Sequence, residues 1–326
     1  MAARAISREK DFSGLRPMRA SSDLGQVASL IEESFGFDLD QSGIEALREL
    51  KVMSHLGPLL WLLERISPEF RNTFLGFVWV EHGQIVGNVT VSVGSAISRR
   101  WVISNVAVRP DYRRRGIAYR LMEAALDWAR SQGGEWAVLQ VRADNEPARR
   151  LYHLLGFEEV TAVAELRLEK VRPVAIVSTE GFTLRQRSHR EWVKEYRLVK
   201  AATSSGAQWV NPVRVTAFNL DPGRRLYRAL ADFFAGRKVY RLAVENEGRF
   251  IALLTVHVSR WESDHGLELT VHPDYRGRLE DMLVTAALTI LSGYPPRAVS
   301  VNHSTDHPQV IAALKQYGFV EQRTLA

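Results

Sequence analysis

Val108-Arg-Pro-Asp-Tyr-Arg-Arg-Arg-Gly-Ile-Ala118 decides how the chain is interpreted, because its first six residues return as Val271-His-Pro-Asp-Tyr-Arg276. The segments that follow return in the same order, since Leu121–Leu126 (LMEAAL) matches Leu283–Leu288 (LVTAAL). Similar segments in the same order indicate two copies of one domain. The period is far longer than a solenoid repeat, so each copy is expected to be a globular unit.

The length of the chain agrees with a duplication. At about 150 residues per domain, 326 residues are enough for two domains that each bury a core. The join lies between a strand-like segment at Ala162–Leu168 and another at Phe182–Arg187. We therefore expect one domain over residues 1–171 and a second over residues 172–326.

Apolar periodicity in the first copy predicts helices alternating with strands. Turn and capping residues such as His82-Gly83 and Asn145-Glu-Pro147 separate these elements. The expected elements are helices over 24–35 and 41–55, strands over 73–80, 85–93 and 101–108, a helix from 117, a strand over 137–141, a helix from 146 and strands from 157. The pattern predicts an α/β fold with a mixed sheet covered by helices.

The turn after the strand that ends at Val108 has the composition of an anion site. The first N–H groups of a helix have no intrahelical acceptor, and the helix dipole is positive at that end. Gly116 lets a phosphate approach, small Ala118 keeps the next turn open, and arginines add charge-assisted hydrogen bonds. We expect a pyrophosphate to be held by Arg113, Arg114, Arg115, Gly116, Ile117 and Ala118.

The spacing R-x-x-G-x-A resembles the coenzyme A signature of the GCN5-related N-acetyltransferase (GNAT) superfamily. Two flanking segments, Asn105–Tyr112 and Asn145–Phe157, also resemble that family, and the likeness covers about residues 73 to 160. The resemblance implies two tandem GNAT-like domains of α/β (α+β) type. Each would have a mixed, mainly antiparallel sheet flanked by helices.

The resemblance also implies the parts of a cofactor site. The strand matching Asn105–Val108 would bulge and splay from the strand matching Ala137–Val141, with the thioester of acetyl-CoA in the gap. Backbone N–H groups of Val106, Ala107 and Val108 would hold the pantetheine, and one would stabilise the oxyanion. Asn145 would contact the pantetheine, and Tyr152 would reach the sulfur.

The implied reaction is transfer of an acetyl group from acetyl-CoA to a primary amine, by direct attack in a ternary complex, without a metal. Tyr152 can donate a proton to the departing thiolate, because a phenol with a pKa of about 10 is still protonated at neutral pH. The amine also needs a base, and many relatives place a glutamate on the strand before the turn. Ser104 and Asn105 stand there in this chain, so Glu33 is the candidate, acting through water, ahead of Glu81 and His82 at a hairpin tip.

The second copy has lost one residue in the turn. Leu279 replaces the glycine in effect, and Glu280 and Asp281 place two negative charges in the first helical turn, where they would repel a pyrophosphate. Leu314 stands in the place of Tyr152. We expect this degenerate copy to be inactive, and either to form part of the acceptor site or to be retained for stability.

The charge distribution leaves a second class of function open. Residues 1–170 have equal numbers of basic and acidic side chains, so the whole net charge of +6 falls in residues 171–326. A basic second domain would suit a non-catalytic acyl-CoA sensor or a nucleic-acid-associated protein. Nucleic acid is the less favoured partner, because the basic residues are scattered without an aromatic platform. The acceptor amine, on a small molecule or a peptide, is not specified, nor is the oligomeric state.

Other features concern the compartment. The sequence has no cysteine, which excludes disulfides and thiolate metal sites, and its start has no apolar signal region. No stretch approaches the 18 or so consecutive apolar residues needed to span a bilayer. We expect a cytoplasmic protein that does not enter membranes.

Overall fold

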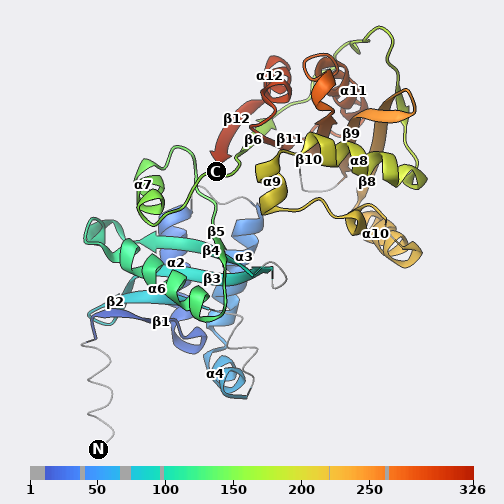
Figure 1. The fold of residues 1–326 in the computed structure, drawn as a ribbon. Coiled ribbons are helices and arrows are strands. Elements are labelled where there is room, and N and C mark those ends of the chain that lie inside the picture. Colours follow the sequence, from blue (N-terminus) through green and yellow to red (C-terminus); the bar gives the residue numbers. More distant parts are fainter. Residues whose placement is uncertain (1–11, 37–40, 67–74, 96–98, 220, 261–263) are drawn as a thin grey trace, which may run out of the picture. The chain divides into compact units, whose positions relative to one another are not determined.

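The computed structural model describes residues 12–36, 41–66, 75–95, 99–219, 221–260 and 264–326 (Figure 1). The chain divides into two compact units, Met1–Gln140 and Val141–Ala326. The described residues form a five-stranded sheet in the first unit and a seven-stranded sheet in the second. This is the α/β architecture of two sheet domains that the sequence predicts.

The sheet of the first unit follows the order of the chain, β1-β2-β3-β4-β5. Its strands are β1 (Gly14–Pro17), β2 (Gly76–Glu81), β3 (Gln84–Ser95), β4 (Arg100–Val108) and β5 (Trp136–Val138). Neighbouring strands are antiparallel except β4 and β5, which are parallel. The predicted hairpin and the strand after it are confirmed, whereas 73 and 74 lie outside the described residues.

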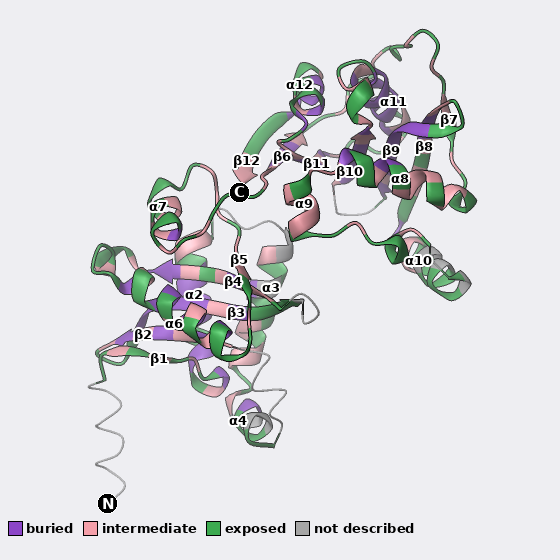
Figure 2. Cartoon of the chain, viewed as in Figure 1, coloured by how far each residue is buried: buried purple, intermediate pink, exposed green. Residues whose placement is uncertain are grey.

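Helices cover both faces of this sheet (Figures 1 and 2). They are α2 (Ala20–Phe35), α3 (Gln41–Ser54), α4 (Gly57–Ile66) and α6 (Ile117–Ser131). Helical spacing brings Val27 and Ile31 of α2 onto one face, where they share a core with Val78. The α6 helix takes the other face, and a Cβ on Gly87 would lie 3.0 Å from Leu121. Helix α4 was not among the expected elements.

The second unit has the strand order β12-β6-β11-β10-β9-β8-β7. Its strands are β6 (Val163–Leu168), β7 (Leu184–Gln186), β8 (Arg237–Asn246), β9 (Arg249–Ser259), β10 (His265–Val271), β11 (Val299–Ser304) and β12 (Val320–Leu325), and its helices are α7 (Glu146–Leu154), α8 (Trp192–Ala202), α9 (Ser205–Val210), α10 (Pro222–Phe234), α11 (Glu280–Ser292) and α12 (Pro308–Gln316). Leu198 of α8 packs on Leu253, and Leu283 of α11 shares a core with Leu254. Since neighbouring residues of a strand face opposite ways, α8 and α11 cover opposite faces.

Strand β6 belongs to the first sequence repeat but pairs with strands of the second. It lies between β11 and β12 and is antiparallel to both. Residues 157–162 were expected to begin a strand but have no strand structure. Leu325, at the end of β12, instead forms an isolated antiparallel bridge with Arg142. The compact units therefore divide at residue 140, before the repeat boundary expected at 171, because β6 completes the second sheet.

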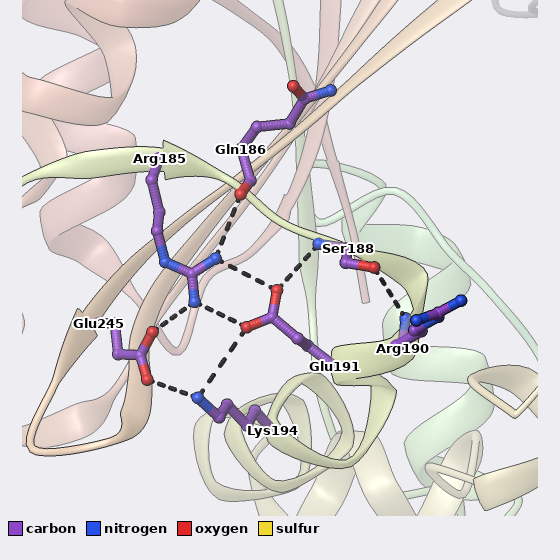
Figure 3. Close-up of polar contacts among 7 residues, drawn as sticks. All are labelled: Arg185, Gln186, Ser188, Arg190, Glu191, Lys194 and Glu245. Carbon is purple, nitrogen blue, oxygen red and sulfur yellow. Dashed lines mark hydrogen bonds and ion pairs between the residues drawn. The ribbon is translucent and has the colours of Figure 1, made fainter.

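A network of charged side chains fixes the start of the second repeat (Figure 3). Ser188 and Glu191 form a capping box, in which the Ser188 N–H donates to the Glu191 carboxylate at 2.9 Å. Arg185 donates to Glu191 at 2.7 Å and also to Glu245, which accepts from Lys194 as well. These hydrogen bonds, that from Arg185 first, lower the pKa of Glu191 to about 2. The network joins β7, β8 and α8.

Candidate active site

The turn between β4 and α6 has the backbone geometry of an anion-binding loop. Gly116 stands at the N-cap of α6 in the left-handed region, with φ 76° and ψ 3°, and Arg114 also has a positive φ of 61°. A Cβ at Gly116 would meet no heavy atom within 4 Å, so the space in front of the helix is open. Successive N–H groups in such a turn point to a common side and form an anion-binding concavity.

The N–H groups of this turn have no acceptor within the described part of the chain. None of the N–H groups from Arg114 to Ala118 donates to a described residue. Helical hydrogen bonding begins farther along the chain, where the Arg120 N–H donates to Gly116 O at 3.1 Å. Residues 113–116 are also exposed. Unpaired donors in open space at the positive end of a helix dipole are the requirements of a phosphate site.

The three arginines of the turn differ in how far they are engaged. Arg113 donates through Nε to Val108 O at 3.0 Å. Arg115 donates to Asp111 O at 2.9 Å, and its guanidinium lies 4.9 Å from the centre of the Tyr112 ring. Arg114 has no hydrogen bond or ion pair with a described residue. Arg113 and Arg115 are thus held in place, while Arg114 is available to an anion.

Strand β4 bulges just before the turn. Asn88 pairs with Ala107 and Thr90 pairs with Ser104, so two residues of β4 oppose one residue of β3. Asn105, inside the bulge, has a φ of 52°. The extra residue redirects the strand, as expected from the family resemblance.

Strands β4 and β5 separate after a short parallel pairing. The last pair is Val102 with Val138, although β4 continues to Val108. Within the described part of the first unit, Val106, Ala107 and Val108 therefore lie on a strand edge that β5 does not cover. Both the bulge and the separation, which the resemblance implied, are present.

Asn88 is a polar residue that the sequence analysis missed. Its side chain is fully buried on β3, its Nδ2 donates to Asn105 O at 3.1 Å, and its Oδ1 has no hydrogen-bond partner among the described residues. The hydrogen bond holds the bulge in place. A buried asparagine within the apolar segment Ile85–Val93 is the signal that identifies it.

Glu33 lies near the C-terminal end of β4. Its Oε2 is 3.4 Å from Nε of Arg109, the residue that follows Val108, and both side chains are about two-fifths exposed. The structure thus brings the candidate base to the strand expected to hold the thioester. Glu81, one of the weaker candidates, instead accepts a hydrogen bond from Trp79 at 2.8 Å, beside the hairpin turn at His82.

Asn145 and Tyr152 are placed by α7 in the second unit. Asn145 is the N-cap, and its Oδ1 accepts from the Ala148 N–H at 3.3 Å. Tyr152 is buried with its ring against Phe157, and its hydroxyl has no hydrogen-bond partner among the described residues. Burial raises the pKa of Tyr152 to about 12. The neighbouring His153 is exposed, as predicted.

The second copy fills the corresponding turn with its own carboxylate. Glu280 is buried, and its two carboxylate oxygens accept hydrogen bonds from the N–H groups of Gly277 at 2.9 Å and Leu279 at 3.1 Å. A side-chain anion thus takes the N–H groups that could hold a phosphate. Leu314, which replaces the tyrosine, is fully buried in the core.

In the ranges that the structure describes, no three His, Asp or Glu side chains are grouped as metal ligands would be. No described helix is both long and apolar enough to cross a bilayer.

Comparisons with known proteins agree with the geometry of the first unit. Residues 44–157 match the model of the acetyltransferase (GNAT) family. The "[Ribosomal protein bS18]-alanine N-acetyltransferase" of Escherichia coli is 27% identical over 123 residues, which cover 38% of this chain and 80% of that protein. The "N-alpha-acetyltransferase RimI" of Mycobacterium tuberculosis is 29% identical over 124 residues, which cover 37% and 77%.

Two solved structures resemble the whole chain. A GCN5-related N-acetyltransferase from Sphaerobacter thermophilus aligns with a TM-score of 0.58 at 15% identity, over 95% of this chain and 93% of that one. A tandem GNAT protein from the clavulanic acid biosynthesis pathway aligns with a TM-score of 0.54 at 18% identity, over 96% and 97%. At these identities the likeness establishes the tandem GNAT fold.

Proposed function

We propose that this protein acetylates a primary amine with acetyl-CoA as donor, since residues 44–157 match the model of the acetyltransferase (GNAT) family, whose general reaction transfers an acetyl group from acetyl-CoA to an amine. The observation that carries the proposal is the row of unpaired N–H groups from Arg114 to Ala118. They stand in open space after a strand that bulges and separates from its neighbour. These features suit a diphosphate joined to an extended chain.

In this proposal residues of the first sequence repeat bind and orient the donor. The turn over residues 113–118 holds the pyrophosphate, with Arg114 free to add a charge-assisted hydrogen bond. The N–H groups of Val106, Ala107 and Val108 hold the pantetheine along the uncovered edge of β4. One of them stabilises the negative charge that develops on the thioester oxygen when the amine attacks.

Two side chains move protons in the proposed reaction. Glu33 accepts the proton of the attacking amine through water, and Arg109 holds its carboxylate in place at 3.4 Å. Tyr152 donates a proton to the coenzyme A thiolate as the carbon–sulfur bond breaks. Its buried phenol, with a pKa of about 12, stays protonated throughout the neutral range, and its hydroxyl has no other described hydrogen-bond partner. Asn145 is proposed to contact the pantetheine while it caps α7.

We propose a peptide amino terminus as the first acceptor class to test, because the names of both relatives describe acetylation of an alanine or of an α-amino group. Small amines form the second class. The second copy is proposed not to bind the nucleotide, since Glu280 accepts hydrogen bonds from the turn that would hold it.

The activity is measured by released coenzyme A. Since the chain has no cysteine, a thiol reagent detects the coenzyme A thiol without background from the protein. We expect thiol release with acetyl-CoA and at least one member of a panel of peptides and small amines. Binding of acetyl-CoA without turnover across the whole panel would instead favour an acyl-CoA sensor.

A matched pair of variants tests the location of the donor. Arg115 and Arg278 each follow a Pro-Asp-Tyr turn, and each guanidinium lies over the tyrosine ring of that turn. We expect Arg115→Ala to weaken acetyl-CoA binding about tenfold and Arg278→Ala to leave it unchanged. The opposite result would place the nucleotide in the second copy and overturn the proposal.

A further inference from the structure

The second copy keeps the separated strands although its anion-binding turn is filled. Strands β10 and β11 pair in parallel only from His265 with Val299 to Leu267 with Val301. Strand β10 then continues to Val271 and β11 to Ser304 without pairing to each other. A gap is therefore preserved where the first copy is proposed to hold its thioester.

A small cavity of about 160 Å³ lies at this gap. Strand β10 contributes Leu269 and Thr270, β11 contributes His303 and Ser304, and α8 contributes Val199 and Ala202. His307, at the N-cap of α12, completes the imidazole pair. Pockets for drug-sized ligands begin near ~300 Å³, so this cavity suits only a small molecule.

His303 has an unmet hydrogen-bonding requirement in the wall of the cavity. Its side chain is 8% exposed, and its Nε2 is buried without a hydrogen-bond partner among the described residues. A buried polar atom left unpaired costs ~1–3 kcal/mol, so such atoms normally have a partner. The Nε2 atom of His303 therefore indicates that the cavity receives a polar ligand.

The charges around His303 select the sign of that ligand. Burial, then His307 and Arg276, lower the pKa of His303 to about 4, and burial also lowers the pKa of His307, so Arg276 supplies the positive charge beside these rings at neutral pH. Arg276 donates to Ala202 O at 3.1 Å and contacts Nε2 of His307, and its own Nε is buried without a partner among the described residues. The field favours an anion over a metal cation.

The acidic groups nearby are already engaged. Glu280 accepts from the turn at Gly277 and Leu279, and Asp306 accepts from the Ser204 hydroxyl at 2.5 Å. Neither carboxylate therefore supplies the hydrogen-bond partner that Nε2 of His303 lacks. An external anion fits the site better than rearrangement of these two side chains.

We propose that the gap between β10 and β11 is a binding site for a small carboxylate with a short apolar tail. The carboxylate would accept from His303 and the tail would lie against Val199, Ala202 and Leu269. The hydroxyl groups of Thr270 and Ser304 line the same space. The first copy would then hold a nucleotide thioester while the second copy, with the same strand separation, senses or binds a free acid.

Titration of the full chain with sodium propionate tests this proposal, without acetyl-CoA and at constant ionic strength. The readouts are the melting temperature and the NMR signal of the His303 ring, which is assigned from its loss in His303→Gln. We expect a saturable rise in melting temperature, a shift of the His303 signal, and at least tenfold weaker binding in His303→Leu. The matched control His153→Gln, an exposed histidine on α7, should bind as the unmodified protein does.

Two further probes decide the chemistry of the ligand. Propionamide has the same shape without the charge, and phosphate has the charge without the tail. We expect neither to shift the His303 signal at concentrations where propionate saturates. An equal response to propionamide or to phosphate would overturn the assignment, as would a His303 signal that does not move with propionate. Because no acetyl-CoA is present, such a failure leaves the acetyltransferase proposal unaffected.

Discussion

Replacing the glycine at either end of α6 by alanine distinguishes an effect on nucleotide binding from an effect of backbone strain. Gly116 has a φ of 76° at the start of the helix, and Gly133 has a φ of 77° just beyond its end. A methyl group added at either position would meet no heavy atom within 4 Å. Alanine in the left-handed region costs ~1–2 kcal/mol, so both Gly116→Ala and Gly133→Ala should reduce the free energy of unfolding by about that amount.

The two variants should differ in their affinity for acetyl-CoA. A methyl group at residue 116 projects into the open space in front of the unpaired N–H groups, where the proposal places the pyrophosphate. Loss of one charge-assisted hydrogen bond costs ~1.5–3 kcal/mol, which corresponds to a Kd raised about 10- to 100-fold. Gly133→Ala should leave the Kd within about twofold of the unmodified protein.

Isothermal titration with acetyl-CoA measures the Kd, and urea unfolding checks that both variants are destabilised alike. If Gly116→Ala and Gly133→Ala bind acetyl-CoA equally well, the turn does not hold the nucleotide and the reasoning fails. If both variants lose affinity by the same factor, backbone strain alone explains the loss. That result would also mean that the turn does not hold the nucleotide.

Three further predictions concern single side chains. Tyr152→Phe should lower kcat about 100-fold with an unchanged Kd for acetyl-CoA, and kcat of the unmodified protein should show no decline from phenol ionisation up to about pH 10, since the pKa of Tyr152 is about 12. Glu280→Gln should reduce the free energy of unfolding by ~1–3 kcal/mol in urea titrations, because its carboxylate accepts from two N–H groups of the turn; no change would mean that these hydrogen bonds contribute nothing. Glu191→Gln should be less stable than the unmodified protein at neutral pH, because the folded-state pKa of Glu191, about 2, lies below its ordinary 4.5. This difference in stability should disappear as pH falls through 2. A difference in thermal unfolding that does not change with pH would refute the prediction.

Most elements of the first sheet were predictable because local signals agree there. Alternating apolar residues predict the β2–β3 hairpin, and Gly116 with the following apolar positions predicts α6. Local signals could not show that residues 163–168 pair with β11 and β12, because pairing between distant strands leaves no mark in a single segment. The apolar pattern likewise could not predict that β5 pairs with β4 over only a few residues, since the separation of the two strands depends on a bulge at Asn105.

The candidate site was predictable in part for similar reasons. The turn over residues 113–118 is defined by local sequence, and its unpaired N–H groups follow from backbone geometry. The position of Glu33 beside Arg109 depends on how α2 packs on the sheet, which no local signal in the sequence shows. Glu280 was expected to repel a phosphate, and the structure adds that it binds the turn itself. The roles of Asn145 and Tyr152 stay predictions.

The insertion of β6 between β11 and β12 makes one sheet depend on strands from both repeats. A fragment that begins at residue 172 would lack this strand and would leave the facing edges of β11 and β12 without their partner. Unpaired edges of that kind promote aggregation. Neither half can therefore be expressed alone with its strand pairing intact, because residues 172–326 lack β6 and residues 1–171 leave β6 without β11 and β12.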